Sequence, residues 1–332
     1  MNHRLEIVSN PTPLVPAPVL SQELGIELYI KRDDLAGPTL GGNKSRQLEY
    51  YFGAAQAAQA DTILITGAVQ SNFARIAVAV ARSQGMHAIV QLEDRVKSNS
   101  AIHKSSGNVM LNRLLGAEIM TYPEGEDEIG ADAALDLRAA ELASEGRFPY
   151  VIHLAEDHPP LGALGYVEAA KEILSQISDV DFFVVPSGSG ATHAGLLAGL
   201  RGAGSIARVI GSCVRRERVL QMARIERVIE RLTHLYKGAA AVELSDIEIW
   251  DGAFAPGYGQ LGAAAMSAMK LMARTEGLIL DPVYTAKGFA AVPTLVASGV
   301  IPKGARVCFI HTGGLAALFA YEEIIANFPE LP

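Results

Sequence analysis

Short runs rich in β-branched residues alternate with longer helical patterns along almost the whole chain, and this alternation limits the possible folds most strongly. Residues 62–66 (TILIT) predict a buried strand, and a helix over about 71–84 follows it. Further strands are predicted at 88–92, 119–122, 150–154, 182–185, 208–213 and 306–310. Helices are predicted at about 108–115, 131–144, 165–177, 217–236 and 262–275, and after Thr192 and Gly314. Strands separated by helices in this way indicate an α/β fold with open parallel sheets, in which ligands collect at the carboxyl ends of the strands.

Size and charge set further limits. The 332 residues are too many for one small core and suit two domains or one large α/β domain. The formal charge of −8 and the lack of a basic stripe indicate no nucleic-acid partner. We expect no transmembrane helix and no signal peptide, because no apolar run is long enough and the opening MNHRLEIVSNPTPL lacks a basic-then-apolar order. The proline-rich opening segment is predicted to lie extended across the surface.

The cysteine content excludes two classes of site. Cys213 and Cys308 are too few for a disulfide framework and lack metal-ligand spacing, so we expect no metal. Each lies in an apolar, strand-like run, which is typical of a buried structural thiol. A reducing cytoplasm is consistent with this pattern.

The run Gly41-Gly42-Asn43-Lys44 precedes a helix predicted over about 45–58. Two glycines permit a tight turn, and Lys44 then lies at the positive end of the helix macrodipole. That position would lower the pKa of the lysine, and a neutral amine is what Schiff-base chemistry requires. The alternative for this loop taken alone is a solvated surface lysine.

Four further loops follow predicted strands or a short strand-like run, and they carry small or hydroxyl residues. Ser71 or Asn72 is suited to cap a helix whose free N–H groups could hold a carboxylate, although a simple helix cap is an equal alternative. The turn after DFFVV contains the glycines and hydroxyl residues of a phosphate cradle: Gly188, Ser189, Gly190, Ala191 and Thr192. It lacks the lysine of a nucleoside-triphosphate loop. Thr312 follows the strand at 306–310, and Tyr284 and Thr285 follow the run LIL at 278–280 in a similar position.

These motifs, in order along nearly the whole chain, resemble the D-cysteine desulfhydrase and 1-aminocyclopropane-1-carboxylate deaminase family. The matching runs are KRDD at 31–34, GGNK at 41–44, QSN at 70–72, GSGATHAG at 188–195, GYG at 257–259, DPVYTAK at 281–287 and HTGG at 311–314. The family belongs to the fold type II enzymes that depend on pyridoxal phosphate. The resemblance therefore implies two open parallel-sheet domains with three layers each. It also implies pyridoxal 5′-phosphate as cofactor and a small amino acid as substrate.

The resemblance also assigns roles to residues. It implies that Lys44 is the Schiff-base lysine, that Ser71 and Asn72 contact the substrate carboxylate and the cofactor hydroxyl, and that Ser71 can carry a proton. Tyr284 is implied to contact the substrate, and Thr312 to pair with the pyridine nitrogen. Residues 188–192 would hold the phosphate. The implied domains are a large cofactor-binding domain, 1–45 with 160–332, and a small inserted domain, 46–159, in a homodimer.

Two positions bear on the choice of substrate. The deaminase branch has glutamate where this chain has Thr285, and a threonine near the pyridine ring cannot supply the charge that strengthens carbanion delocalisation. Thr285 is therefore predicted to line the substrate site and to favour β-elimination. Phe73 departs from the desulfhydrase pattern, in which many members have histidine after QSN. Unless residue 73 faces away from the ligand, this change removes a titratable group beside the carboxylate site.

The predicted reaction is α,β-elimination. D-cysteine, which would give pyruvate, hydrogen sulfide and ammonia, is the first choice, followed by L-cysteate (a sulfo-lyase) and the deaminase substrate. In the hypothesis the amine of Lys44, or Tyr284 or Ser71, removes the Cα proton. Other possibilities are a racemase or dehydratase of the same fold, a catalytically silent relative, and a phosphate-ligand-binding α/β protein without covalent chemistry.

Overall fold

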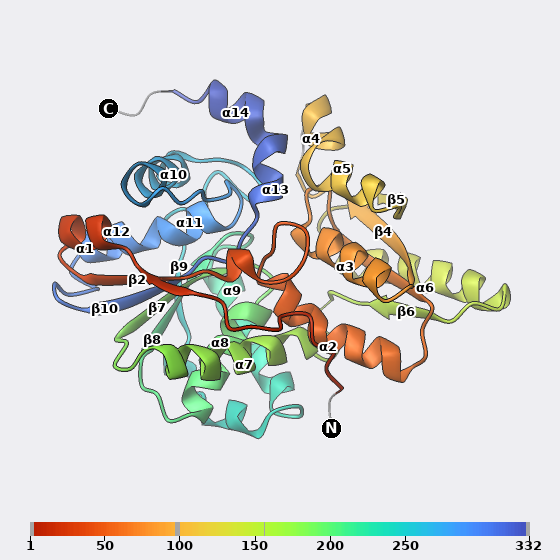
Figure 1. The fold of residues 1–332 in the computed structure, drawn as a ribbon, viewed down its shortest axis with the longest axis horizontal. Coiled ribbons are helices and arrows are strands. Elements are labelled where there is room, and N and C mark those ends of the chain that lie inside the picture. The colour runs from red at the N-terminus through yellow and green to blue at the C-terminus, as the bar shows by residue number, and fades with distance from the viewer. Residues whose placement is uncertain (1–2, 97–99, 156, 330–332) are drawn as a thin grey trace.

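The computed structural model describes residues 3–96, 100–155 and 157–329 and contains two separate sheets (Figure 1). The larger has six strands in the order β1-β2-β10-β7-β8-β9, and the smaller has four in the order β5-β4-β3-β6. All neighbouring strands are parallel except β1 and β2. The α/β architecture with two parallel sheets is therefore confirmed.

The strands of the larger sheet are β1 Leu14–Pro16, β2 Glu27–Lys31, β7 Phe182–Ser187, β8 Arg208–Cys213, β9 Glu248–Trp250 and β10 Arg306–Ile310. Those of the smaller sheet are β3 Thr62–Ala68, β4 His87–Glu93, β5 Glu118–Tyr122 and β6 Pro149–Ile152. The helices of the first half are α1 Pro18–Leu24, α2 Lys44–Ala57, α3 Asn72–Ser83, α4 Ala101–Ser105, α5 Gly107–Leu114 and α6 Glu128–Ser144. Those of the second half are α7 Leu161–Gln176, α8 Ala191–Gly202, α9 Arg218–Leu232, α10 Ala263–Glu276, α11 Thr285–Phe289, α12 Ala291–Ala297, α13 Leu315–Leu318 and α14 Glu322–Ala326.

Helices cover both faces of each sheet. Successive residues of a strand point to opposite sides of the sheet, so one strand packs against both helix layers. In β7, Phe182 and Val184 pack toward α1 and α10 to α12, whereas Phe183 and Val185 pack toward α7, α8 and α9. In the smaller sheet, strand residues such as Ile63 pack against α2 and α3, and Leu64 packs against α6. Both domains are therefore three-layered, as predicted.

The structure departs from the sequence prediction in three places. The opening segment is not simply extended, because Leu14–Pro16 pairs as β1 and Pro18 begins α1. Proline is tolerated in both positions, since one is an edge strand and the other a first helical turn. Strands β2 and β9 were not predicted, and 278–280 is irregular rather than a strand. Within the described residues no helix is long and apolar enough to cross a membrane.

The strands of the smaller sheet all come from residues 62–152, inside the predicted inserted domain. Helix α2 straddles the predicted boundary at 45/46 and packs both against α7 of the large domain and against α3 of the small one. The boundaries 46 and 159 remain predictions.

A buried ion network fixes the start of α2. Arg46 donates to both carboxylate oxygens of Asp33, at 3.0 and 2.9 Å, and to Glu172 of α7 at 2.8 Å. Lys31, at the end of β2, also pairs with Glu172. Burial alone would raise the pKa of Asp33, but the guanidinium of Arg46 and the hydrogen bonds lower it below its ordinary value. The network thus ties the end of β2 to α2 and α7, immediately beside Lys44.

Replacing Asp33 with asparagine is expected to destabilise the protein by about 3–5 kcal/mol, because the buried Lys31 and Arg46 would then share the single charge of Glu172. Urea unfolding of the holoprotein measures this loss. As a control, Lys171→Gln breaks the exposed pair between Lys171 and Glu168 and should change stability by no more than about 0.5 kcal/mol. A loss of less than about 1 kcal/mol for Asp33→Asn would show that the network does not anchor α2.

Candidate active site

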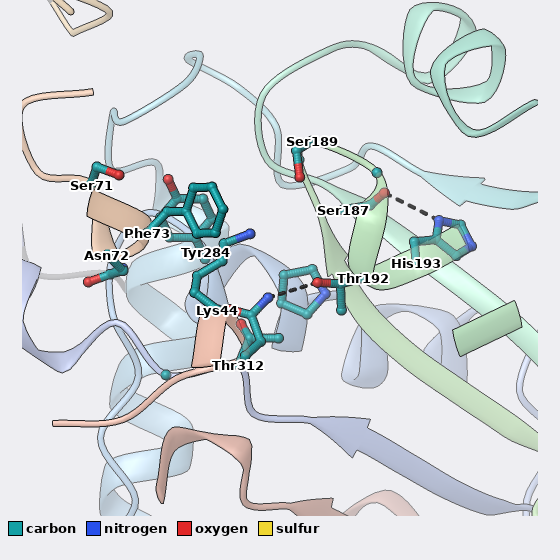
Figure 2. Close-up of a pocket in the computed structure, with 15 residues that line it drawn as sticks. Lys44, Ser71, Asn72, Phe73, Ser187, Ser189, Thr192, His193, Tyr284 and Thr312 are labelled. Atoms are coloured by element: carbon teal, nitrogen blue, oxygen red, sulfur yellow. Dashed lines mark hydrogen bonds between the residues drawn. The ribbon is translucent and has the colours of Figure 1, made fainter. Parts of the chain in front are cut away.

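The predicted loops meet in one central cavity of about 540 Å³ between the two domains. Its lining comes from the 43–44 turn, the start of α3, the turn after β7, the start of α8, the end of the 281–284 loop and the turn after β10. The lining residues are Asn43, Lys44, Ser71, Asn72, Phe73, Pro186, Ser187, Gly188, Ser189, Gly190, Thr192, His193, Tyr284, Thr312 and Gly313. In Figure 2 the side chain of Lys44 lies between Ser71, Asn72 and Phe73 on one side and Ser187, Ser189 and Thr192 on the other.

Lys44 is the first residue of α2. Gly41 precedes it with a φ of +57°, and a Cβ there would lie 2.0 Å from the carbonyl oxygen of Asp34, so only glycine fits the turn. The Nζ atom of Lys44 donates to Gln47 Oε1 at 3.3 Å and lies 5.6 Å from the ring centroid of Phe73. Burial lowers the pKa of Lys44 to about 8. The direction is the one predicted, but its cause is burial rather than the helix macrodipole.

The turn after β7 supplies hydrogen-bond donors without partners in the helix. The first rung of α8 runs from the Ala194 N–H to the Gly190 carbonyl, so the three N–H groups before Ala194 have no acceptor within the helix. Gly190 has a φ of +97°, which favours glycine. Thr192 Oγ1 accepts from Asn43 Nδ2 and from Gln47 Nε2, both at 2.8 Å, which leaves its proton free to donate. This is the donor set that an anionic oxygen cluster such as a phosphate requires.

The start of α3 presents two polar side chains to the cavity. Ser71 is the N-cap residue, and its Oγ accepts from the Ala74 N–H at 3.1 Å, as the sequence predicted. Asn72 Oδ1 accepts from Asn108 Nδ2 at 3.0 Å, so the amide N–H₂ of Asn72 is left to donate to a ligand oxygen. Gln70 holds Asn108 in place through the backbone N–H of Asn108 at 2.9 Å.

Tyr284 also lines the cavity, and its hydroxyl is 2.6 Å from the hydroxyl of Tyr258. Burial, followed by the neighbouring Tyr258, raises the pKa of Tyr284 well above its ordinary value, so the phenol stays protonated. Asp281 accepts from the backbone N–H groups of Val283, Tyr284 and Thr285, at 2.8 to 2.9 Å, and so fixes this turn.

Two predicted site residues do not reach the central cavity. Thr285 is fully buried and its hydroxyl bonds to Asp281 at 2.7 Å, because it starts α11 and packs into the core. Its assignment as a substrate contact is corrected accordingly. Ala191 lines an adjoining cavity with Tyr51 and Pro160, so only its backbone N–H belongs to the cradle.

Phe73 lines the central cavity, so it does not face away from the ligand site. His193 is buried with Nδ1 3.2 Å from Ser187 Oγ, and burial lowers its pKa to about 4. It is therefore neutral near pH 7 and supports the turn rather than carrying charge. Among residues 3–96, 100–155 and 157–329 no cluster of three or more histidine, cysteine or acidic side chains could hold a metal.

Sequence reasoning missed several supporting residues. Gln47 follows Lys44 by three positions, which places it on the same helix face, and this spacing could have predicted the contact. Tyr258 lies in the motif GYG, and Asp281 begins DPVYTAK, but neither was given a role. Asp281 caps the N–H groups of the residues that follow it, and an aspartate in such a turn is a short-range signal that could have been recognised. The partner of Tyr258 is Tyr284, 26 residues away, so no short motif predicts that pair.

Comparison with known proteins gives the family. A model described as pyridoxal-phosphate dependent enzyme matches residues 6–313. The chain belongs to this family. As a pyridoxal-phosphate-dependent enzyme it has relatives named D-cysteine desulfhydrase in Salmonella paratyphi C, with 40% identity, and in Klebsiella pneumoniae, with 39%. Each match covers 96% of this chain and 96% of the relative.

Solved structures agree with this assignment. A structure described as an ACC deaminase homologue matches with a TM-score of 0.85 and 33% identity, covering 98% of this chain and 95% of the other. An O-ureido-L-serine synthase matches with a TM-score of 0.68 and 19% identity over 100% and 97% of the two chains, and supports the fold alone. The fold type II architecture and the cofactor, pyridoxal phosphate, are therefore confirmed.

The cavity fits this cofactor. A desolvated lysine amine and a cluster of unpaired donors at a helix N-terminus face the same space, as an aldehyde and a phosphate on one molecule require.

Reloading of the apoprotein with pyridoxal phosphate should accelerate as pH rises to about 8 and then level off. A lysine whose pKa is lowered to about 8 is mostly neutral above that pH, and the neutral amine is the form that attacks the aldehyde. The growth of visible absorbance after mixing measures the rate. A rate that keeps rising through about pH 10, as for an ordinary lysine, would mean that Lys44 is not desolvated.

Proposed function

We propose that this enzyme catalyses α,β-elimination on a small amino acid, with D-cysteine, converted to pyruvate, hydrogen sulfide and ammonia, as the first choice. One observation carries the proposal: the Nζ of Lys44 shares a cavity with the glycine turn at 188–190 and with Ser71, Asn72 and Tyr284. The relatives named D-cysteine desulfhydrase support the choice of substrate, since they match over 96% of the chain.

In the proposed arrangement Lys44 would hold the cofactor aldehyde, and the backbone of 188–192 with the Thr192 hydroxyl would hold the phosphate. The free amide N–H₂ of Asn72 would donate to the ring hydroxyl, and Thr312 would pair with the pyridine nitrogen. When bound, pyridoxal phosphate withdraws the electron pair left at Cα and so makes elimination from Cβ possible.

Lys44 is the best candidate for the base. Its pKa of about 8 leaves a usable fraction of neutral amine near neutral pH, whereas Tyr284 stays protonated and is limited to donating a hydrogen bond. The neutral amine of Lys44 would take the Cα proton of the bound substrate, and such base catalysis is typically worth about 10²–10⁴-fold in rate. Ser71 orients the substrate carboxylate at the start of α3. The enamine released after loss of the Cβ substituent hydrolyses to a keto acid and ammonia.

The choice of elimination over cyclopropane opening rests on the charge near the ring. Among the residues that the structure describes, no acidic side chain lines the central cavity, and Thr285, at the position of the deaminase glutamate, is turned into the core. Without a carboxylate near the pyridine nitrogen the electron sink is weaker, which suits a good leaving group at Cβ. L-cysteate is therefore the second candidate substrate, and the cyclopropane acid the third.

Other classes fit less well. The family match disfavours a phosphate-ligand-binding protein without covalent chemistry. A racemase or a serine dehydratase would use the same cavity, so only substrate tests separate them. The desolvated Lys44 counts against a catalytically silent relative.

Two further proposals concern the setting of the enzyme. The two cysteines are unpaired and buried, and burial raises each pKa to about 12, which is consistent with the cytoplasm. A homodimer, as the family resemblance implies, is supported by Leu35 and Leu40, which are 56% and 51% exposed and line one open hollow with Leu315.

A panel of amino acids assayed for keto acid tests the function. We expect pyruvate from β-chloroalanine and from D-cysteine, with one sulfide per pyruvate in the second case, and none from D-serine or the cyclopropane acid. Lys44→Ala should lose activity by at least about 10³-fold, because this change removes both the base and the anchor of the cofactor. Lys171→Ala, at an exposed ion pair, is the matched control and should keep activity. Activity on the cyclopropane acid alone would overturn the proposal.

A further inference from the structure

A second cavity adjoins the central one and is unexpectedly cationic. This side cavity, of about 520 Å³, shares Lys44, Ser71, Phe73, Gly188, Ser189 and Tyr284 with the central cavity. Its remaining lining is Gln47, Gly67, Ala68, Arg95, Leu154, Arg215 and Tyr258. Among the described residues, the guanidinium groups of Arg95 and Arg215 line this space and no carboxylate does, which suits an anionic ligand.

Arg215, in the loop after β8, carries the inference. Its side chain is only 6% exposed, and Nη1 pairs with Glu128 at 2.6 Å. Nε and Nη2 are buried and make no hydrogen bond, and the Nη2 contact with Glu126 Oε2 is a longer ion pair of 3.5 Å. Buried guanidinium donors without partners are costly, which points to a ligand that satisfies them.

The unpaired atoms form the edge of the guanidinium that binds two oxygens at once. Arg95 uses the same edge on Glu93, with Nε and Nη2 at 2.6 and 2.7 Å from the carboxylate oxygens. Since Glu128 holds Nη1 of Arg215 and does not line the side cavity, the opposite edge is left to face that space.

The carboxylate that holds Nη1 of Arg215 is shared with other arginines. Glu128 also pairs with Arg216 at 2.8 Å and Arg224 at 3.0 Å, so one carboxylate serves three guanidinium groups. These arginines, against the cost of burial, lower the pKa of Glu128 to about 2, so its single charge is fully present and already shared.

We propose that the side cavity binds an oxyanion on the Cβ of the substrate through the Nε and Nη2 edge of Arg215, so that the substrate class includes amino acids with a Cβ sulfonate. The order of the residues is consistent with a substrate that extends from the central cavity into the side cavity. Of these two cavities, Asn72 lines the central one and Arg215 the side one, and Lys44 and Ser71 line both. A thiol offers one atom to this edge, whereas a sulfonate offers two oxygens.

The reaction on such a substrate balances, and this step rests on the proposed elimination. Lys44 takes the Cα proton, the electron pair forms the Cα–Cβ double bond, and the C–S bond breaks with its pair leaving on sulfite. Water then converts the released enamine to pyruvate and ammonia. Arg215 stabilises negative charge that grows on the leaving sulfite.

The test uses ligands that cannot react, so that it measures binding independently of catalysis. Calorimetric titration of the holoenzyme compares 3-sulfopropanoate with propanoate, which lacks the sulfonate. The first should bind at least about 10-fold more tightly, and Arg215→Gln should abolish this difference, because a charge-assisted two-oxygen contact is lost. Arg215→Lys keeps the charge without the fork and should give an intermediate affinity.

Arg216→Gln is the matched control, because Arg216 shares Glu128 but lines a different, outer cavity. It should keep the preference for 3-sulfopropanoate. Equal binding of the two acids to the wild type, or an equal loss in the Arg215 and Arg216 variants, would overturn the inference and leave Arg215 as a bridge between the domains.

Kinetics separate this inference from the proposed function. The ratio of kcat/KM for cysteate over β-chloroalanine should fall about 100-fold in Arg215→Gln. If β-chloroalanine yields no keto acid while 3-sulfopropanoate binds as expected, the elimination proposal fails and the anion site stands. If β-chloroalanine reacts but the two acids bind alike, the anion site fails and elimination stands.

Discussion

Desolvation of one lysine amine is the constraint around which the site is built. Lys44 can begin α2 in this position only because the glycine turn before it fits against the Asp34 carbonyl, and because the Arg46–Asp33–Glu172 network holds α2 on β2 and α7. The apolar ring of Phe73 helps to exclude water from the amine. The same burial that stabilises the fold around α2 thus lowers the pKa of Lys44 to about 8.

The two domains contribute different parts of the site. Helix α2 supplies the amine, and the part of the chain around the larger sheet supplies the cradle at the start of α8 and the turn fixed by Asp281. The part around the smaller sheet supplies Ser71 and Asn72 at the start of α3. Glu128 of α6 connects the small domain to the arginines that follow β8.

Short sequence motifs correctly predicted those features of the site that depend on neighbouring residues alone. Glycines before Lys44, the cap at Ser71 and the turn after β7 each have a short-range cause, and the structure has them where they were expected. Thr285 was misplaced because Asp281, four residues earlier, draws its hydroxyl into the core. The roles of Arg215 and Tyr258 depend on Glu128 and Tyr284, which are distant in sequence, so no short motif could have predicted them.

The most direct measurement of the central claim is the site of covalent attachment. Borohydride reduction of the holoenzyme followed by peptide mass spectrometry locates the lysine that carries the pyridoxyl group. Lys287 is the informative competitor, since burial also lowers its pKa to about 8, but its Nζ is held by the carbonyls of Phe254 and Gly257 at 2.9 and 2.6 Å. The account predicts the label on Lys44, and a label on Lys287 or on any other lysine would contradict it.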